Sequence, residues 1–143
     1  NAALLSGKPA IADDSGLEVD LLDGQPGIYS ARYGGKDATD SSNNQKLLEQ
    51  LGDAPLEKRS ARYQCIIVYM RHANDPTPII CQGGWEGHIA LEPRGDGGFG
   101  YDPLFYLQDL DCHAAEMDKT HKNRISHRGK ATAQLLEQLR QRI

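Results

Sequence analysis

The chain has 143 residues, of which 25% are charged and 38% hydrophobic, and its formal net charge at pH 7 is −4. This length suits one domain with a single substantial core, and the composition is that of a globular rather than a disordered protein. A broad nucleic-acid-binding surface is not expected, because such surfaces need clustered Lys and Arg. With no apolar run long enough to span a bilayer and no signal-peptide pattern, we expect no membrane partner and a cytoplasmic location.

Three cysteines, Cys65, Cys81 and Cys112, form an odd number and show no CxxC spacing. A disulfide framework and a zinc knuckle are therefore not expected, and the chain suits a reducing compartment.

The N-terminal residues predict a helix end and then a strand. Residues 1–5 followed by Gly7 are typical of the last turn of a helix. Because a single turn is marginal on its own, we expect the natural protein to have a segment before Asn1. The apolar run 9–12 predicts a buried strand. Asp is a poor strand residue, so residues 13–14 are expected to mark the C-terminal edge of that strand.

The middle of the chain predicts a strand, a helix and a second strand. Residues 17–21 alternate between apolar and acidic side chains, which is typical of a half-buried strand. A helix is expected from Thr39 or Asp40 toward Gly52, with leucines on one face. Residues 61–71 are rich in β-branched and aromatic side chains and predict a central strand.

Further strands are expected at residues 79–81, 85–91 and 104–106, and short turns between the first two favour antiparallel pairing. The tail, residues 126–143, predicts a helix with apolar residues at intervals of four. Together the elements predict an α/β protein with a mixed sheet flanked by helices.

The first candidate site is the acidic pair Asp13 and Asp14, followed by Ser15 and Gly16. Two adjacent carboxylates repel each other unless a cation or a proton lies between them. At a strand end of an α/β sheet, this pair would be placed where ligands bind. The alternative is an Asx-turn that only reverses the chain.

The second candidate is the glycine-rich stretch 95–103, which contains Phe99, Gly100, Tyr101 and Asp102. Its glycines let a ligand approach the backbone closely. Stacking of a nucleobase on an aromatic ring contributes about 1–3 kcal/mol and tolerates different bases. Asp102 could select a base through hydrogen bonds or hold the loop. The alternative is a surface turn whose aromatic side chains pack into the core.

The third candidate is a basic cluster at residues 119–130, with Lys122, His127 and Arg128. It lies where the last helix is expected to begin, and backbone N–H groups at that point favour anions. Arg128 could donate two hydrogen bonds to one phosphate. The alternative is a solvated charged helix face. Taken together, carboxylates for Mg²⁺, an aromatic loop for a base and cations for phosphates describe a nucleotide site.

Four stretches in this order resemble the non-canonical purine nucleoside triphosphate pyrophosphatases, also called the inosine triphosphatase, dITP/XTP pyrophosphatase or Ham1-like family, and its bacterial members most closely. The stretches are residues 13–17 (DDSGL), 26–32 (PGIYSAR), 98–103 (GFGYDP) and 126–129 (SHRG). Each motif alone is weak, but four in order at similar intervals across the whole chain are specific.

The resemblance implies Mg²⁺-dependent hydrolysis of ITP, dITP or XTP to the monophosphate and pyrophosphate. It implies that Asp14 is the general base and a metal ligand, and we expect Asp13 to assist the metal or to support the turn. Substrate contacts are implied for Ser15, for the loop of Phe99, Gly100, Tyr101 and Asp102, and for Lys122, His127 and Arg128.

The resemblance further implies a homodimer and an elongated mixed sheet with a cleft between two lobes. Family members open with a strand and a loop carrying Ser/Thr-x-Asn-x-x-Lys, which grips the triphosphate, and then a metal-binding glutamate. Neither feature is present in this sequence. The resemblance therefore implies one pyrophosphatase domain over residues 1–143 that lacks its N-terminal strand–loop–helix segment.

Two alternatives remain at this point. A phosphatase with a phosphoaspartate intermediate would use the first aspartate of the pair as nucleophile, but it needs a second Asp two positions later, where the chain has Ser15. The other alternative is a truncated module that binds nucleotide or dimerises without turnover.

Overall fold

The computed structural model describes residues 1–142, and its strands form one six-stranded sheet in the order β2-β1-β3-β4-β5-β6. Every strand pairing within these residues is antiparallel. The strands are β1 (Ala10–Val19), β2 (Pro26–Gly27), β3 (Ser60–Met70), β4 (Ile79–Ile89), β5 (Phe105–Leu107) and β6 (Cys112–His113). The helices are α1 (Ala2–Ser6), α2 (Asp40–Leu51), α3 (Lys119–Ile125) and α4 (His127–Arg142).

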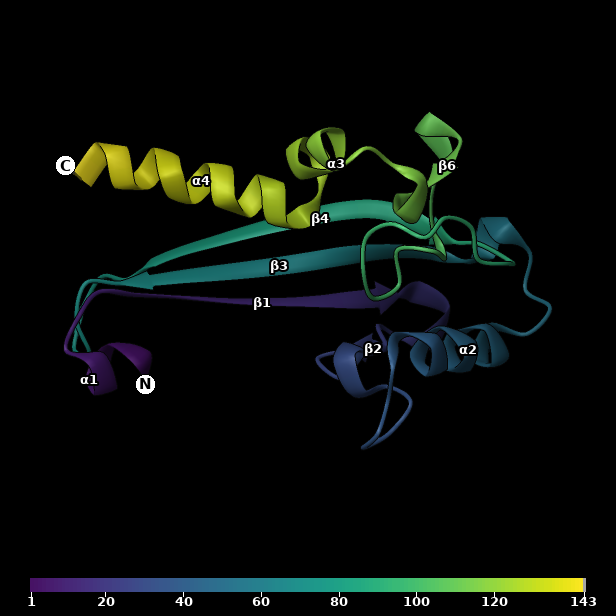
Figure 1. Cartoon of the computed structure of the whole chain (residues 1–143), viewed down its shortest axis with the longest axis horizontal. Coiled ribbons are helices and arrows are strands. Elements are labelled where there is room, and N and C mark those ends of the chain that lie inside the picture. The colour runs from purple at the N-terminus through teal and green to yellow at the C-terminus, as the bar shows by residue number, and fades with distance from the viewer. Residues whose placement is uncertain (143) are drawn as a thin grey trace.

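The long strands β1, β3 and β4 lie side by side and give the molecule its elongated shape (Figure 1). Helix α4 runs along β3 and β4, whereas α2 and β2 lie at the opposite end of the molecule from the two termini. The expected α/β class, with helices flanking an elongated sheet, is confirmed. The expected mixed pairing is corrected, because the strands of residues 1–142 pair only in the antiparallel sense.

The sheet has one buried face and one open face, because successive side chains of a strand point to opposite sides. Burial alternates along β3 and β4 with this period. We call the side that carries Leu17, Tyr63 and Trp85 the buried face, and the side that carries Glu18 and Arg62 the open face. This difference decides which residues of β1 belong to the same site.

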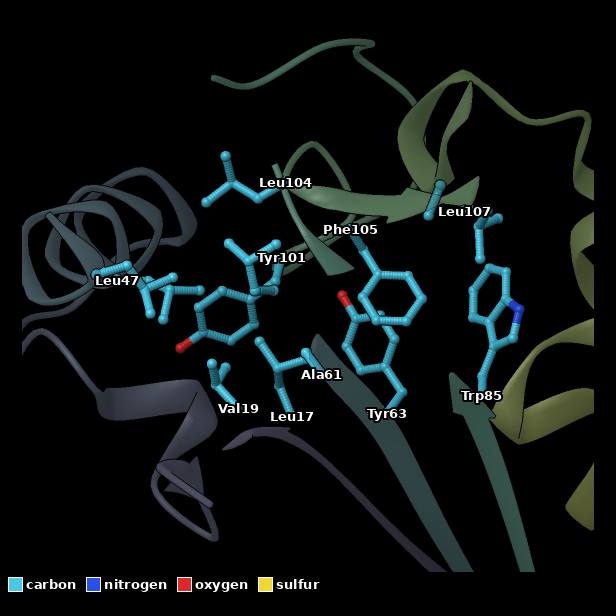
Figure 2. Packing of buried hydrophobic residues seen from close by; sticks show 13 residues of the cluster. Leu17, Val19, Leu47, Ala61, Tyr63, Trp85, Tyr101, Leu104, Phe105 and Leu107 are labelled. Carbon is cyan, nitrogen blue, oxygen red and sulfur yellow. The ribbon is translucent and has the colours of Figure 1, made fainter. Parts of the chain in front are cut away.

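Two hydrophobic clusters fill the buried face. The larger joins α2 to the sheet near the glycine-rich loop, and Figure 2 shows the rings of Tyr63, Phe105 and Trp85 side by side within it. The smaller lies beneath α4 and contains Cys65, Ile67, Ile79, Cys81, Ala131 and Leu135. The first cluster therefore supports the loop, and the second seats α4 on the sheet.

The boundaries of α2 follow from its capping residues. The Thr39 side chain accepts a hydrogen bond from the Ser42 N–H (3.1 Å), and the Ser42 hydroxyl accepts one from the Thr39 N–H (2.9 Å). This reciprocal capping box satisfies two backbone donors at the start of the helix. Gly52, with a φ of 53°, ends the helix, so the expected boundaries are confirmed with Thr39 as the N-cap.

The start of α4 lies close against the sheet. Ser126 accepts a hydrogen bond from the Gly129 N–H through its hydroxyl (3.1 Å). A Cβ atom on Gly83 of β4 would collide with the carbonyl oxygen of His127, so a glycine is needed at this crossing. The close approach brings His127 and Arg128 to the buried face, next to β1.

Several expected boundaries were wrong. The strand predicted at residues 9–12 continues through Asp13 and Asp14 to Val19, so the acidic pair lies within β1 and not at its C-terminal edge. The strands predicted at residues 79–81 and 85–91 are one strand, β4. The predicted last helix is confirmed to Arg142, and Ile143 lies outside the described residues.

Among the helices and strands of residues 1–142, three were not predicted: the helix α3 and the short strands β2 and β6. Within residues 1–142, no helix combines the length and the apolar character that crossing a membrane requires.

Candidate nucleotide site

The glycine-rich loop is held by one buried carboxylate, that of Asp102, which is 2% exposed. Its Oδ1 accepts a hydrogen bond from the Tyr63 hydroxyl (3.0 Å). Its Oδ2 accepts from the Phe99 N–H (3.0 Å) and from the Lys122 ammonium (2.5 Å). Gly98 is required next to it, because a Cβ there would collide with Oδ2. Of the two roles considered for Asp102, the geometry favours holding the loop.

Helix α2 holds the next residue of the loop, Gly100. The Asp40 carboxylate accepts a hydrogen bond from the Gly100 N–H (3.0 Å), and the Asn44 side-chain amide donates one to the Gly100 carbonyl (3.0 Å). The Tyr101 hydroxyl donates to the Ser30 carbonyl (2.6 Å), and its side chain is only 4% exposed. Tyr101 is therefore a buried anchor of the loop, and burial raises the pKa of its phenol.

Phe99 is the aromatic side chain that the loop presents to solvent, with 53% of its surface exposed. The Lys122 ammonium lies 4.7 Å from the centre of its ring, and the Arg128 guanidinium carbon lies 5.1 Å from it. Both distances are within the range of cation–π attraction. The loop and the basic cluster, which are separate in the sequence, therefore meet at this ring.

His127 forms the floor of the same region. It is 3% exposed, and its ring stacks on that of Tyr63 with centroids 4.6 Å apart and planes 13° apart. Burial, together with the positive charge of Arg128, lowers the pKa of His127 from 6.5 to about 4. The imidazole is therefore neutral at pH 7. Its Nδ1 is buried and has no hydrogen-bond partner within residues 1–142.

These groups surround a cavity of about 230 Å³ on the buried face, which we call the base pocket. Its lining residues are Ser15, Gly16, Leu17, Ser30, Ala31, Asp40, Asn43, Tyr63, Phe99, Gly100, Tyr101, His127 and Arg128. The Arg128 Nε donates to the Ser15 hydroxyl (3.2 Å) and lies 3.5 Å from a carboxylate oxygen of Asp13. Arg128 thus connects β1 with the aromatic loop.

Asp14 does not face the base pocket. It pairs with Ile66 of β3 and, as a neighbour of Asp13 on an extended strand, points to the open face. There it lines a second cavity, of about 240 Å³, together with Glu18, Gln64 and Ile66. The two carboxylates of the acidic pair are therefore on opposite faces of β1.

Ser15 and Gly16 line both cavities. Strand β2 pairs with β1 only at Leu17 and Glu18. In the described part of the chain, the edge of β1 at Ser15 and Gly16 is therefore not covered by another strand. The base pocket and the cavity that contains Asp14 therefore adjoin at this edge.

The structure brings most of the predicted site residues together: Ser15, Phe99, Gly100, Tyr101, Lys122, His127 and Arg128 meet around the base pocket, with Asp102 behind it. Asp13 joins them through Arg128, and Asp14 is separate. Sequence reasoning missed Tyr63, Asp40 and Asn44. Only Tyr63 had a usable signal, its place among the inward-facing residues of the predicted central strand.

A comparison with protein families matches residues 1–138 to the Ham1 family. A protein called dITP/XTP pyrophosphatase from Escherichia coli O157:H7 is 58% identical over 140 residues, which are 98% of this chain and 71% of that protein. One of the same name from Shewanella oneidensis is 58% identical over 142 residues, 99% of this chain and 69% of that one.

Solved structures agree with this match. The HAM1 protein of Coxiella burnetii superposes with a TM-score of 0.93 at 52% identity, over 98% of this chain and 71% of that one. The Ham1 protein of Staphylococcus aureus superposes with a TM-score of 0.90 at 42% identity, over 97% of this chain and 70% of that one.

Proposed function

The chain belongs to the Ham1 family, and we propose that it hydrolyses non-canonical purine nucleoside triphosphates, such as ITP, dITP and XTP, to the monophosphate and pyrophosphate. The names of its relatives from Escherichia coli and Shewanella oneidensis support this activity. The observation in the structure that carries the proposal is the base pocket, where the exposed ring of Phe99 lies next to two cations and a neutral histidine.

We propose that the purine stacks on Phe99 and that Arg128 and His127 provide hydrogen-bond donors to it. A neutral imidazole has one N–H, and protonation at Nε2 leaves the buried Nδ1 as an unprotonated acceptor. A pocket that offers donors accepts the 6-oxo group of hypoxanthine or xanthine. It disfavours adenine, whose amino group at the same position is also a donor.

On the open face, we propose Asp14 as the general base. It deprotonates or orients a water molecule, whose oxygen attacks the α-phosphorus. The bond between this phosphorus and the oxygen bridging to the β-phosphorus then breaks, and pyrophosphate leaves with the electron pair. General base catalysis of this kind typically contributes about 10²–10⁴-fold to the rate. The unpaired edge at Ser15 and Gly16 supports this arrangement, because the nucleotide can pass from one face to the other there.

Mg²⁺ is our proposal for the cofactor. The open-face cavity offers two carboxylates, Asp14 and Glu18, of which Glu18 lies 3.6 Å from the Arg62 guanidinium, so Asp14 is the ligand that we propose. Mg²⁺ is often held by one or two carboxylates together with substrate phosphates, and Asp14 suits that mode. Asp13, on the other face beside Arg128, does not suit the role of a second ligand to the same ion. No group of three His, Cys, Asp or Glu side chains within residues 1–142 is arranged to hold a metal. When bound, the ion neutralises charge on the phosphates and on the departing pyrophosphate.

We propose a cytoplasmic location and a homodimer. The location is supported by the three cysteines, which are free in the described part of the chain. The homodimer is supported by exposed apolar side chains on the surface, among them Ile28 (78% exposed) and Ile80 (63% exposed). Light scattering on the eluting peak of a size-exclusion column measures the assembled mass directly.

A turnover assay with Mg²⁺ tests the activity. ITP, dITP, XTP, GTP and ATP are incubated with the purified chain, and pyrophosphate, orthophosphate and nucleoside monophosphate are each quantified. We expect one pyrophosphate for each monophosphate, with the first three substrates preferred. Orthophosphate as the first product would contradict the proposal in favour of a phosphatase. Binding of ITP without turnover, followed by the fluorescence of Trp85, would instead support a non-catalytic module.

A further inference from the structure

Tyr63 lies on a central strand of the sheet and contacts both His127, which lines the base pocket, and Asp102, which lies behind it. It is 7% exposed, and it pairs with Leu17 of β1 and with Trp85 of β4. The face of its ring stacks on His127, which is the first residue of α4. Its hydroxyl reaches Asp102, which holds the aromatic loop. One side chain thus connects α4, the sheet and the loop.

The packing of the Tyr63 ring does not need the hydroxyl. The ring lies 4.6 Å from Phe105 and 6.2 Å from Trp85, centroid to centroid, within a hydrophobic cluster (Figure 2). A buried hydroxyl is costly unless it is hydrogen-bonded, and here it donates to Oδ1 of Asp102. Burial and the neighbouring carboxylate raise the pKa of Tyr63 well above 10, so the hydroxyl keeps its proton and acts as the donor.

The consequence concerns the orientation of the Asp102 carboxylate. Its Oδ2 carries the bonds to the Phe99 N–H and to Lys122, so that oxygen must face the loop. The Tyr63 hydroxyl donates a hydrogen bond to the other oxygen, Oδ1, and so restrains rotation of the carboxylate about the Cβ–Cγ bond of Asp102. Lys122, fixed in this way, keeps its ammonium 4.7 Å from the centre of the Phe99 ring.

We propose that Tyr63 is a positioning residue for purine binding: its hydroxyl orients Asp102, which in turn holds Phe99 and Lys122 in the geometry that receives the base. Tyr63 does not touch the base through its hydroxyl and takes no part in the chemical step. This inference rests on the proposed function, because it assigns a role within the same nucleotide site.

The test removes only the hydroxyl, by Tyr63→Phe in the whole chain. Loss of one buried hydrogen bond to a carboxylate is expected to raise KM for ITP about 5- to 10-fold, while kcat stays within about twofold. The backbone amide signal of Phe99 in a ¹⁵N–¹H spectrum should move, because its acceptor is no longer restrained. Tyr106→Phe is the matched control, since it removes a Tyr–Asp hydrogen bond of 2.8 Å on β5, outside the base pocket. It should change neither quantity.

A double-mutant cycle separates positioning from packing. In an Asp102→Asn background the hydroxyl has no carboxylate to orient, so the added effect of Tyr63→Phe on KM should fall below about twofold. The proposal is overturned if Tyr63→Phe leaves KM and the Phe99 signal unchanged, or if its effect is undiminished in that background. The Phe99 signal is measured without nucleotide, so it tests whether Tyr63 orients the Asp102 carboxylate independently of any turnover. Failure of the proposed function would instead appear as a wild-type chain that releases no pyrophosphate.

Discussion

The two faces of β1 differ in how much the protein has already arranged. On the buried face, Asp13 and Ser15 are tied to Arg128, and through it to the ring of Phe99. On the open face, one residue along the same strand, the Asp14 side chain makes no hydrogen bond or ion pair within residues 1–142 and is exposed to solvent.

This difference separates recognition from chemistry. A pocket that discriminates between bases gains from groups that are fixed before the ligand arrives, since less conformational entropy is then lost on binding. A general base must keep its lone pair free for water, and a metal ligand must keep it free for the ion. The buried face has the first property, and the open face has the second.

Of the variants that test this difference between the two faces, Asp14→Asn should show the largest loss of activity. The amide keeps the shape of the side chain but is a poor base, so kcat should fall by about 10²–10⁴-fold. The fold should persist, because the carboxylate is exposed and has no partner in the described structure. Pyrophosphate release and a thermal unfolding curve measure the two effects.

Asp13→Asn is the matched control on the other face. It weakens the ion pair with Arg128, so it should raise KM and leave kcat nearly unchanged. If Asp13→Asn lost kcat while Asp14→Asn kept it, the assignment of chemistry to the open face would be wrong.

The neutral His127 predicts a dependence of stability on pH. Its pKa is about 4 in the folded protein and 6.5 in the unfolded chain, so the unfolded chain takes up a proton first as the pH falls. The contribution of neutral His127 to the free energy of unfolding is therefore complete above pH 6.5 and is lost progressively toward pH 4. The loss amounts to about 3 kcal/mol.

Urea unfolding at several values between pH 4 and pH 7 measures this loss. His127→Gln should flatten the dependence, whereas the same change at the exposed His72 should not. A slope that survives His127→Gln would place the titration elsewhere.

The sequence was informative where local signals and tertiary structure agree. Thr39, the leucines of α2 and Gly52 define a helix by themselves, and the structure agrees with them. The three stretches carrying Ser15, Phe99 and Arg128 also meet as expected, although they lie far apart along the chain.

Local signals failed where a neighbouring strand or helix decides the outcome. Asp13 and Asp14 are poor strand residues, yet they pair with Ile67 and Ile66 of β3, and this pairing extends β1 past the expected end. Glycine is typical of turns, but Gly83 lies within β4. A glycine is needed there because the backbone of α4 occupies the space that a side chain would fill.

The role of Tyr63 could not be predicted for a related reason. Its hydroxyl acquires a meaning only when Asp102, which is 39 residues further along the chain, is placed beside it by the fold. The same holds for Asn44, whose partner Gly100 lies 56 residues away.

Phe99→Ala tests the base pocket itself. Loss of a stacking ring should raise KM for every purine triphosphate by roughly 5- to 150-fold, which corresponds to about 1–3 kcal/mol. Because 53% of Phe99 is exposed, stability should change little. Leu136→Ala, at an apolar residue of α4 that is 50% exposed and lies outside the base pocket, is the control and should leave KM unchanged. Equal KM values for the two variants would show that Phe99 does not stack on the base.

The smallest effect is expected for the ion pairs of the open face. Glu18, Arg62 and Glu86 lie side by side on β1, β3 and β4, and Arg62 also binds Asp20 through two hydrogen bonds, of 2.8 and 2.9 Å. The pKa of Asp20 falls to about 2 through these bonds, but the Glu86 side chain is 73% exposed. Exposed pairs contribute little because water and salt screen them.

Glu86→Gln should therefore lower the free energy of unfolding by less than about 1 kcal/mol, since Arg62 keeps its bonds to Asp20. Urea unfolding at low salt and at high salt measures the difference, which should shrink as salt is added. A loss of several kcal/mol that salt does not reduce would mean that the open face is as tightly organised as the buried face. The contrast between the two faces of β1 would then rest on Asp14 alone.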